Sequence, residues 1–400
     1  MTGVDVRMVG FRYAPAIGGA ELLARRLLQE LGDRVRADVV TLATDNRSDW
    51  LQVLIDGERS EPTSYDVDGR PVTALGRWPD ATRRRLKLLA PFYHLPKSPA
   101  PTLMGRMLSR ELEALTRGAR LIHNVFMGRE AFSLGLLLSA LRAGVPFVFT
   151  PLRHERPLGW NSPAFRELYR EAGAVIALTD VEARWLISQG AHPERTHVIG
   201  IGPSNDPSAS PEPARQRVGN QKIVLFLGQL HRYKGFRELL SAAHAFVGRA
   251  DIRFVFAGPD IRGHARAFLD APANVIYLGD VPTALRDSLL QACTVLCVPS
   301  SRESFGAVLV EAWTCGKPVI GGPAAATEVL VDDGRDGLIV PQKPAAIAAA
   351  LARLVDDEAL CRRLGAAGRQ KVAQRYSWKT IADRHLEIYE HLWERTPSPA

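Results

Sequence analysis

The strongest constraint on the fold is a rhythm of short apolar segments, each followed by a stretch with the amphipathic pattern of a helix. The segments are VDVRMVG (4–10), RADVVTLA (36–43), RPVTALG (70–76), ARLIHNV (119–125), VPFVFT (145–150), GAVIAL (173–178) and THVIGI (196–201), then KIVLFLG (222–228), DIRFVFAG (251–258), NVIYLGD (274–280), CTVLCVPS (293–300), KPVIGG (317–322) and GLIV (337–340). Apolar strands that alternate with such helices predict parallel sheets covered on both faces. We therefore expect an α/β chain with doubly wound, Rossmann-like sheets.

The rhythm is interrupted once, by the Pro-, Ser- and Asn-rich segment GPSNDPSASPEPARQRVGNQ. This composition is typical of a linker. We expect one domain at 1–203, a linker at 204–219, a second domain at 220–382 and a C-terminal helix at 383–400 that can pack back on the first domain. Because doubly wound sheets bind ligands beyond the carboxyl ends of their strands, the cleft between the domains is the expected site.

Composition agrees with a two-domain globular protein, since 46% of the 400 residues are hydrophobic and 24% are charged. The N-terminal MTGVDVRMVGFRYAP carries charges throughout and has no h-region of a signal peptide. The longest apolar run, AFSLGLLLSAL (131–141), is shorter than the roughly 20 residues that span a bilayer and predicts a core helix. We expect a cytoplasmic protein whose cysteines are buried free thiols, namely Cys293, Cys297, Cys315 and Cys361.

Two acids stand in an otherwise apolar segment, ESFGAVLVEAWTCGKPVIGG, which begins at Glu303 and places Glu311 eight positions later. We expect a helix from about Ser304 to Cys315, stopped by the glycine and proline that follow. At 1.5 Å per residue the Cα atoms of the two glutamates would be about 12 Å apart. That span fits the distance from the ribose to the sugar of a nucleotide diphosphate sugar, with free amides at the helix start for the pyrophosphate.

Each acid also has a structural interpretation. Glu303 could stabilise the helix dipole by about 0.3 to 1 kcal/mol, and Glu311 could lie on a solvated face. The neighbours of Glu311 are apolar, however, and a carboxylate in such a helix must be paired or must face a ligand. The functional interpretation is therefore favoured.

These segments carry a resemblance to a known family. ESFGAVLVEAWTCGKPVIGG, followed by ATEVLVDDGRDGLIV, resembles the donor-binding signature of the retaining family 4 glycosyltransferases of GT-B architecture, whose motif is E-x7-E. VLFLGQLHRYKG, FVFAGPD and NVIYLGDVP resemble the preceding segments of that family, and YAPAIGGAELLARRLLQEL its N-terminal Gly-Gly loop and helix. The resemblance is weakest between about Asp45 and Arg120. It implies two Rossmann-like domains facing each other across a cleft, with the acceptor on the first and the donor on the second.

The resemblance also implies roles for individual residues. Glu303 would hold hydroxyls of the donor sugar, Glu311 the ribose hydroxyls and Lys234 the pyrophosphate. The implied catalytic residues are Lys234, Arg232, Glu303 and His154, and the implied donor-binding residues are Gly18, Gly19, Gly228, Gln229, Gly258, Val281, Ser304, Phe305, Gly306 and Glu311. Cations are needed because the leaving nucleotide diphosphate gains a negative charge in the transition state.

The sequence departs from the family pattern in two places. One concerns a cation near the pyrophosphate, and the other lies at the end of the first half of the chain. The family arginine after the strand-ending glycine is replaced by Gln229, for which Arg232 is the candidate substitute. The asparagine-glycine segment of the family appears here as VIGIGPSN, from which nothing is carried over. Near the first-half strand ends, His154 is a candidate donor contact and His123 is more consistent with a structural role.

No metal is implied. The single D-x-D, from Asp66 to Asp68, precedes a glycine and predicts a turn. The front-face mechanism commonly proposed for the family needs no separate general base, because the departing phosphate can accept the proton of the acceptor. The expected co-substrate is a nucleotide diphosphate sugar, and the acceptor is a hydroxyl of a lipid-linked molecule or a glycan.

The excess positive charge is concentrated in one segment. Residues 77–110 hold eight Lys or Arg and one acid, giving +7 of the formal net charge of +8. Two interpretations of this segment are equally consistent with the sequence. It is either a solvated insertion or a surface that contacts an anionic membrane or a lipid pyrophosphate. Two other functions stay open: a GT-B sugar epimerase or phosphorylase, and a nucleic-acid-binding protein suggested only by the basic composition. The latter is disfavoured because the charge is confined and no recognition motif is present.

Overall fold

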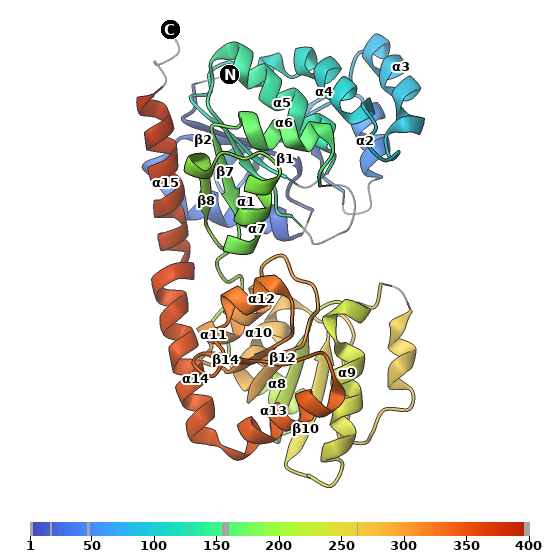
Figure 1. Ribbon diagram of the computed structural model, residues 1–400, viewed down its shortest axis with the longest axis vertical. Coiled ribbons are helices and arrows are strands. Elements are labelled where there is room, and N and C mark those ends of the chain that lie inside the picture. Colours follow the sequence, from blue (N-terminus) through green and yellow to red (C-terminus); the bar gives the residue numbers. More distant parts are fainter. Residues whose placement is uncertain are drawn as a thin grey trace. The chain divides into compact units, whose positions relative to one another are not determined.

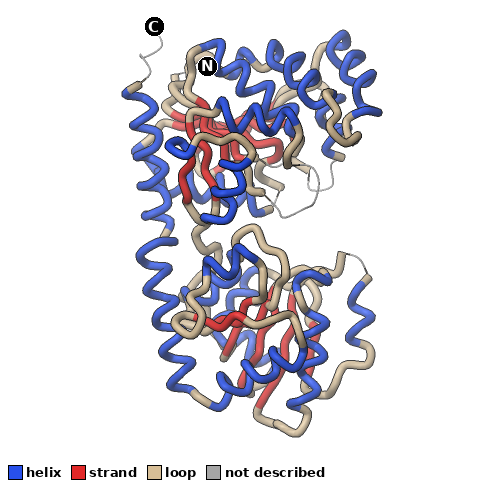
Figure 2. The backbone as a smooth tube through the Cα atoms, in the orientation of Figure 1, coloured by secondary structure: helices blue, strands red, loops and turns tan. Residues whose placement is uncertain are grey.

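The computed structural model describes residues 3–16, 18–45, 49–126, 128–153, 160–261 and 263–395 (Figure 1). The chain forms two compact units. The first unit comprises residues 1–199 and 378–400, and the second comprises residues 200–377. Each unit is an α/β layer structure in which helices lie on a central sheet (Figure 2).

The first unit is built on an eight-stranded sheet of order β3-β4-β2-β1-β5-β6-β7-β8. Its strands are β1 (Val6–Arg12), β2 (Ala37–Ala43), β3 (Thr63–Val67), β4 (Arg70–Ala74), β5 (Ile122–Val125), β6 (Phe147–Thr150), β7 (Ala174–Ala177) and β8 (Thr196–Val198). All neighbours are parallel except the β3–β4 pair. The helices are α1 (Gly19–Leu31), α2 (Trp50–Asp56), α3 (Asp80–Leu89), α4 (Ala100–Glu111), α5 (Glu130–Ala143), α6 (Pro163–Glu171), α7 (Asp180–Ser188) and α15 (Trp378–Glu394).

Each predicted strand segment contains a strand, but β3 was not predicted. Its sequence, TSYDV, is short and mostly exposed, so it carries little of the apolar signal that marks the other strands. It pairs antiparallel with β4 through a tight turn at Asp68 and Gly69, whose φ angles are 55° and 75°. The predicted turn at the D-x-D is thereby confirmed, and Asp68 is bound there by Arg25 at 2.6 Å.

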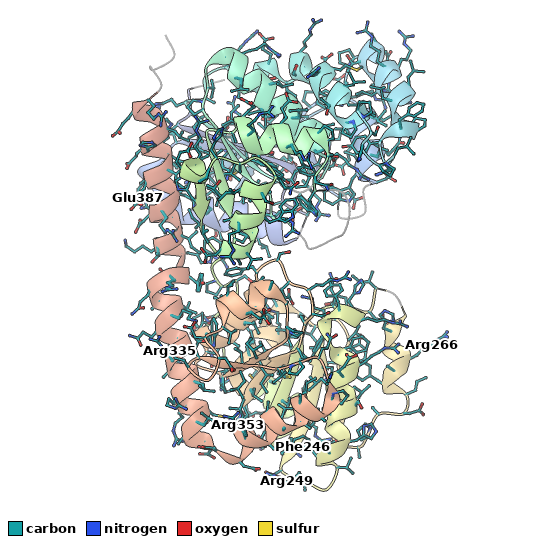
Figure 3. All side chains as sticks on the ribbon, viewed as in Figure 1. Phe246, Arg249, Arg266, Arg335, Arg353 and Glu387 are labelled. Carbon is teal, nitrogen blue, oxygen red and sulfur yellow. The ribbon has the colours of Figure 1, made fainter. Side chains whose placement is uncertain are left out.

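Helix α15 returns the chain to the first unit and packs against α1. Its buried face includes Ile381, His385 and Tyr389, while Glu387 lies on the opposite, exposed face (Figure 3). The Tyr389 hydroxyl is hydrogen-bonded to His123 Nδ1, with the two atoms 2.7 Å apart. The helix is therefore fixed to the sheet by a buried polar contact as well as by apolar packing.

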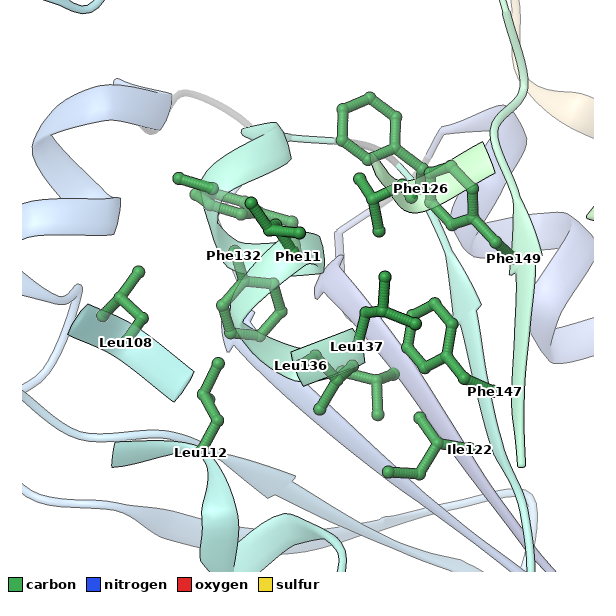
Figure 4. Packing of buried hydrophobic residues seen from close by; sticks show 14 of the residues in the cluster. Phe11, Leu108, Leu112, Ile122, Phe126, Phe132, Leu136, Leu137, Phe147 and Phe149 are labelled. Carbon is green, nitrogen blue, oxygen red and sulfur yellow. The ribbon is translucent and has the colours of Figure 1, made fainter. Parts of the chain in front are cut away.

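The core of the first unit lies between the sheet and α4 and α5 (Figure 4). The predicted core helix at 131–141 is confirmed as α5, which is buried along most of its length. Phe132 of this helix meets Phe11 of β1 edge to face, with ring centroids 6.0 Å apart. This contact packs α5 against β1 close to the carboxyl end of that strand.

The second unit has a six-stranded parallel sheet of order β11-β10-β9-β12-β13-β14. Its strands are β9 (Lys222–Leu227), β10 (Ile252–Ala257), β11 (Val275–Tyr277), β12 (Val295–Val298), β13 (Val319–Gly321) and β14 (Gly337–Ile339). Its helices are α8 (Glu212–Val218), α9 (Phe236–Ala242), α10 (Thr283–Ala292), α11 (Ala307–Thr314), α12 (Ala325–Leu330), α13 (Pro344–Asp356) and α14 (Glu358–Lys371). The predicted buried thiols are confirmed for all four cysteines.

The expected linker at 204–219 is part of the second unit. Residues 212–218 form α8, which packs against α10, and the Ala214 amide donates to the Ser288 hydroxyl at 2.9 Å. The segment is thus anchored despite its composition. The unit boundaries also differ from the expected ones, because the first unit ends at Ile199 and resumes at Trp378.

Candidate active site

The site begins at the point where the strand order of the second unit reverses. β9 and β12 are neighbours, and the strands that follow each of them lie on opposite sides of this pair. In doubly wound sheets, ligands bind beyond the carboxyl ends of the strands at this reversal. The loop after β9 and the loop after β12 meet there, since the Ser301 amide donates to the Tyr233 carbonyl at 2.8 Å.

Lys234 and Glu303, two of the predicted catalytic residues, are brought together by these loops. Lys234 Nζ lies 2.6 Å from Glu303 Oε1, and the two side chains are 20% and 12% exposed. Gln342 donates its side-chain amide to the carbonyls of Tyr233 and Pro299, at 3.0 and 2.8 Å. The ion pair therefore sits on two loops that are hydrogen-bonded to each other and to a third.

Glu311 lies in α11 and is buried, as its apolar neighbours predict. One carboxylate oxygen accepts from the Ser204 hydroxyl and the other is paired with Arg286 of α10, each at 2.5 Å. Asn205 donates to the Thr314 hydroxyl at 2.9 Å. The carboxylate is thus held by partners from two other segments.

These partners were missed by the sequence reasoning. Ser204 and Asn205 lie in the expected linker, and Arg286 lies in a helix without any motif. A usable signal existed, because a carboxylate in an apolar helix requires a partner. What the sequence does not provide is the identity of that partner, since it comes from a helix 25 positions upstream.

The helix after β12 begins later than expected. α11 starts at Ala307, with Gly306 as its N-cap in a left-handed conformation at φ 94°. Glu303, Ser304 and Phe305 therefore precede the helix, and the spacing derived from helical rise does not apply to them. Phe305 is buried against Tyr376, with ring centroids 5.4 Å apart. The first helical amides, those that an anion could reach, belong to Ala307 and its successor.

The glycines that follow the strands allow close backbone contact. A Cβ on Gly258 would lie 2.0 Å from the Gly228 carbonyl oxygen, so no larger residue fits there without a shift. Both residues have positive φ angles, of 140° and 152°. The two predicted donor-binding glycines are thus adjacent at the ends of β9 and β10, and each is needed for the local fold.

The remaining predicted residues of the second unit lie in the loops that follow the carboxyl ends of β9 and β11. Gln229 and Arg232 are exposed, and the Arg232 guanidinium has no hydrogen-bond or ion-pair partner within the described part of the chain. Val281 is half-buried in the loop between β11 and α10. Arg232 precedes Lys234 in a single 3₁₀ turn, so both cations belong to one short element.

In the first unit, Gly18 and Gly19 start α1, as predicted. A Cβ on Gly18 would lie 2.3 Å from Glu21 Oε2, and Arg12 Nε pairs with Glu21 Oε1 at 2.6 Å. Gly18 therefore makes room for a buried ion pair, whereas a Cβ on Gly19 would meet nothing within 4 Å. Of the pair, Gly19 is the one with open space beside it.

The structure describes only one of the two histidines singled out in the sequence, His123. His123 is buried, and its second ring nitrogen lies 2.8 Å from the Thr150 hydroxyl. Burial lowers the pKa of His123 well below its usual range, so the ring is a neutral structural group. His154 lies outside the described residues.

Comparison with known proteins identifies the family. Residues 211–371 match the model of the group 1 glycosyl transferases, and residues 18–202 match that of the glycosyl transferase 4-like domain. Together the two models span most of the chain. The chain belongs to this glycosyltransferase family. It is a glycosyltransferase, as the resemblance predicted.

This glycosyltransferase is 28% identical to the α-maltose-1-phosphate synthase of Mycolicibacterium smegmatis, over 74% of its own length and 86% of that protein. It is 34% identical to the D-inositol 3-phosphate glycosyltransferase of Thermomonospora curvata, over 57% of its own length. That alignment spans 60% of the relative. The sequence likeness to the inositol enzyme is therefore partial.

Solved structures establish the fold of the glycosyltransferase as GT-B. Anabaena Alr3699/HepE in complex with UDP-glucose aligns over 97% of this chain and 100% of that chain, with a TM-score of 0.71 at 20% identity. The sucrose-phosphate synthase of Thermosynechococcus elongatus aligns over 98% of this chain, with a TM-score of 0.69 at 19% identity. Within the described ranges, no helix is both long and apolar enough to cross a membrane.

Proposed function

We propose that this glycosyltransferase binds its nucleotide diphosphate sugar on the second unit and transfers the sugar with retention of configuration. The observation that carries the proposal is the Lys234–Glu303 pair at the strand-order reversal, with Glu311 held in the helix that follows. In this proposal Glu303 binds sugar hydroxyls, Lys234 binds the pyrophosphate and Glu311 binds the ribose. The amides of Ala307 and Val308 at the start of α11 contribute to phosphate binding.

The cations supply the chemistry of the proposed reaction. Cleavage of the bond between the sugar and the phosphate leaves an additional negative charge on the nucleotide diphosphate. Lys234 stabilises this charge more in the transition state than in the bound donor, which lowers the barrier. We assign Arg232 as the second cation, in the role that Gln229 cannot fill. Its guanidinium is exposed and lacks a partner within the described residues, so it can turn toward a phosphate.

The remaining steps need neither a metal nor a separate base in this proposal. The leaving phosphate takes the proton of the acceptor hydroxyl on the same face of the sugar, so that the new bond forms where the old one breaks. Lys234 and Arg232 provide the positive charge that a divalent cation would otherwise provide. His154, Gly18 and Gly19 are also assigned to donor binding.

We further propose that the enzyme is cytoplasmic and contacts an anionic membrane through residues 77–110. The buried thiols support a reducing compartment. Within the segment, Arg84 and Arg85 of α3 are exposed and have no ion pair among the described residues. Arg83, by contrast, is bound by Asp56 at 2.6 Å and is part of the local structure.

The test of the proposed donor site is calorimetric titration of the full chain with UDP, GDP and dTDP, preceded by a thermal-shift screen of the corresponding sugars. One of the diphosphates is expected to bind, and its affinity is expected to fall in the Glu311→Gln variant. Absence of binding by all nucleotide diphosphates would overturn the donor site. A product with inverted configuration would overturn only the stereochemical part.

A further inference from the structure

The first unit contains a large cavity that the donor site does not use. It has a volume of about 770 Å³ and lies between residues 93–101 and the start of α6, beside the loop after β5. This size is within the range of small-molecule sites, about 300 to 1,000 Å³. Its aromatic lining consists of Tyr93, Phe126, Trp160 and Phe165. It lies at the carboxyl end of β5, where a doubly wound sheet binds ligands.

The charged groups of this cavity favour an anion. Arg129, Arg166 and Lys97 line it, together with one carboxylate, Glu130. The carboxylate is already engaged, because Tyr93 donates its hydroxyl to Glu130 at 2.9 Å and burial raises the pKa of Glu130. Arg129 Nε, in contrast, is buried without a hydrogen-bond partner in the described structure.

An unpaired buried donor on a cation is costly unless a ligand satisfies it. The Arg129 guanidinium lies over the Tyr93 ring, 5.5 Å from its centroid, and is therefore held in one place at the cavity wall. A phosphate group beside it would accept the unused hydrogen bond. It would also complement the charges of Arg166 and Lys97.

A second, apolar hollow of about 380 Å³ shares residues 95–98 with the first. Its lining includes Leu89, Phe92 and Leu103, and Lys97 lines both hollows. Phe92, Leu95 and Leu103 are 52%, 55% and 42% exposed, and Leu88 next to them is 74% exposed. These are four of the nine exposed large hydrophobic side chains in the described chain, within 16 residues of one another. Such a concentration marks a binding surface rather than scattered apolar residues.

We propose that the two hollows bind one amphipathic acceptor, a hydrocarbon chain that ends in a phosphate-bearing head. The head occupies the larger cavity with its phosphate beside Arg129, and the chain lies along Phe92, Leu95 and Leu103. The shared wall at residues 95–98 joins the larger cavity, with its charged groups, to the second hollow. The inference rests on the proposed function, since the ligand is the molecule that would receive the sugar.

The test uses n-octyl phosphate as the probe, titrated below its micellar concentration into the full chain by calorimetry. Inorganic phosphate supplies the head alone, and n-octyl glucoside supplies the chain with an uncharged head. Arg129→Gln removes the charge and Phe92→Ser with Leu103→Ser removes the apolar surface. Arg353→Gln, at an exposed site of the second unit (Figure 3), is the matched control for the charge. Leu269→Ser, at another exposed site of that unit, is the control for the apolar surface.

We expect octyl phosphate to bind the parent more tightly than either control ligand does. Arg129→Gln should weaken its binding by about tenfold or more, and the Phe92→Ser, Leu103→Ser variant by about tenfold. The two control variants should leave the affinity unchanged. Lys97→Gln, at an exposed residue, is the second charge variant if Arg129→Gln fails to fold.

Equal binding of octyl glucoside and octyl phosphate would overturn the anionic head, and unchanged binding by both charge variants would overturn the assigned cavity. Nucleotide diphosphate binding, measured on the same samples, separates this inference from the proposed function. If the nucleotide binds and octyl phosphate does not, the acceptor inference alone fails. If octyl phosphate binds and no nucleotide does, the donor site fails and the cavity remains an amphiphile site.

Discussion

Lys234 Nζ and Glu303 Oε1 lie 2.6 Å apart, so the cation proposed for the pyrophosphate and the carboxylate proposed for the adjoining sugar neutralise each other. A phosphate that approaches Lys234 must compete with Glu303, while sugar hydroxyls that approach Glu303 can donate to the same carboxylate. A nucleotide diphosphate sugar brings both groups at once. This pair is therefore expected to discriminate between the complete donor and the nucleotide alone.

Lys234→Ala should reduce turnover far more than donor affinity. Removal of one charge-stabilising donor typically lowers kcat by about 10² to 10³-fold, and the affinity for the donor should change less. Steady-state kinetics with radiolabelled donor gives both quantities. Lys379→Ala, which also removes a lysine from an ion pair but at an exposed position of α15, is the control. Equal losses in the two variants would contradict the assigned role.

Glu303→Gln should have opposite effects on the two ligands. The nucleotide diphosphate should bind more tightly, because Lys234 is released from its carboxylate. Transfer of the sugar should become slower, because the sugar hydroxyls then donate to a neutral amide oxygen instead of a charged carboxylate. Calorimetry with the diphosphate and single-turnover assays with the donor measure the two effects. A parallel loss of both would indicate a purely structural pair.

Glu311 and Arg286 should make coupled contributions to the free energy of unfolding. Arg286→Met leaves the buried Glu311 carboxylate without its cation, and breaking a buried pair on one side costs about 3 kcal/mol or more. The expected loss in free energy of unfolding is smaller than this here, because the Arg286 side chain is 22% exposed and solvent screens the pair. The double variant with Glu311→Gln should recover part of the loss in free energy of unfolding. Urea denaturation of the four proteins gives the coupling, and additive losses would contradict it.

The stability of the first unit should depend on pH through His385. Burial lowers the pKa of His385 to about 4, below its ordinary value of 6.5. Because the pKa is lowered in the folded state, the contribution of the neutral His385 to stability is fully present above pH 6.5. This contribution is lost as the pH falls from 6.5 toward 4. The free energy of unfolding should therefore fall in this window, and His385→Gln should reduce the slope. Chemical denaturation between pH 4.5 and 8 measures both, with His244→Gln in the second unit as the control.

Contact with an anionic membrane should depend on Arg84 and Arg85. Each basic residue near such a surface contributes about 1 kcal/mol, so changing both to Glu should abolish flotation with phosphatidylglycerol-containing vesicles. Arg83 is left intact because its ion pair with Asp56 supports the fold. Arg362→Glu with Arg363→Glu, an adjacent exposed pair on α14, is the matched control. Equal flotation of all variants, or none by the parent, would contradict the membrane contact.

The sequence predicted the sheets because their strands are buried on both faces and read as continuous apolar runs. β3 escaped prediction because it is an exposed edge strand whose side chains carry no such pattern. The E-x7-E spacing predicted two site residues, but the local start of α11 depends on Gly306 adopting a left-handed conformation, which no periodicity reveals. Ser204 and Arg286 come together only in the fold, so a motif in one segment could not identify them.

The chain enters the second unit after Ile199 and leaves it before Trp378, which makes that unit a contiguous insertion within the first. Residues 200–377 can therefore be produced alone by simple truncation, whereas a fragment ending at residue 199 would lack α15. That fragment would expose His123 and deprive it of Tyr389, its partner at 2.7 Å. Reassembly of the first unit should accordingly require the α15 peptide in trans or a direct splice between its two parts.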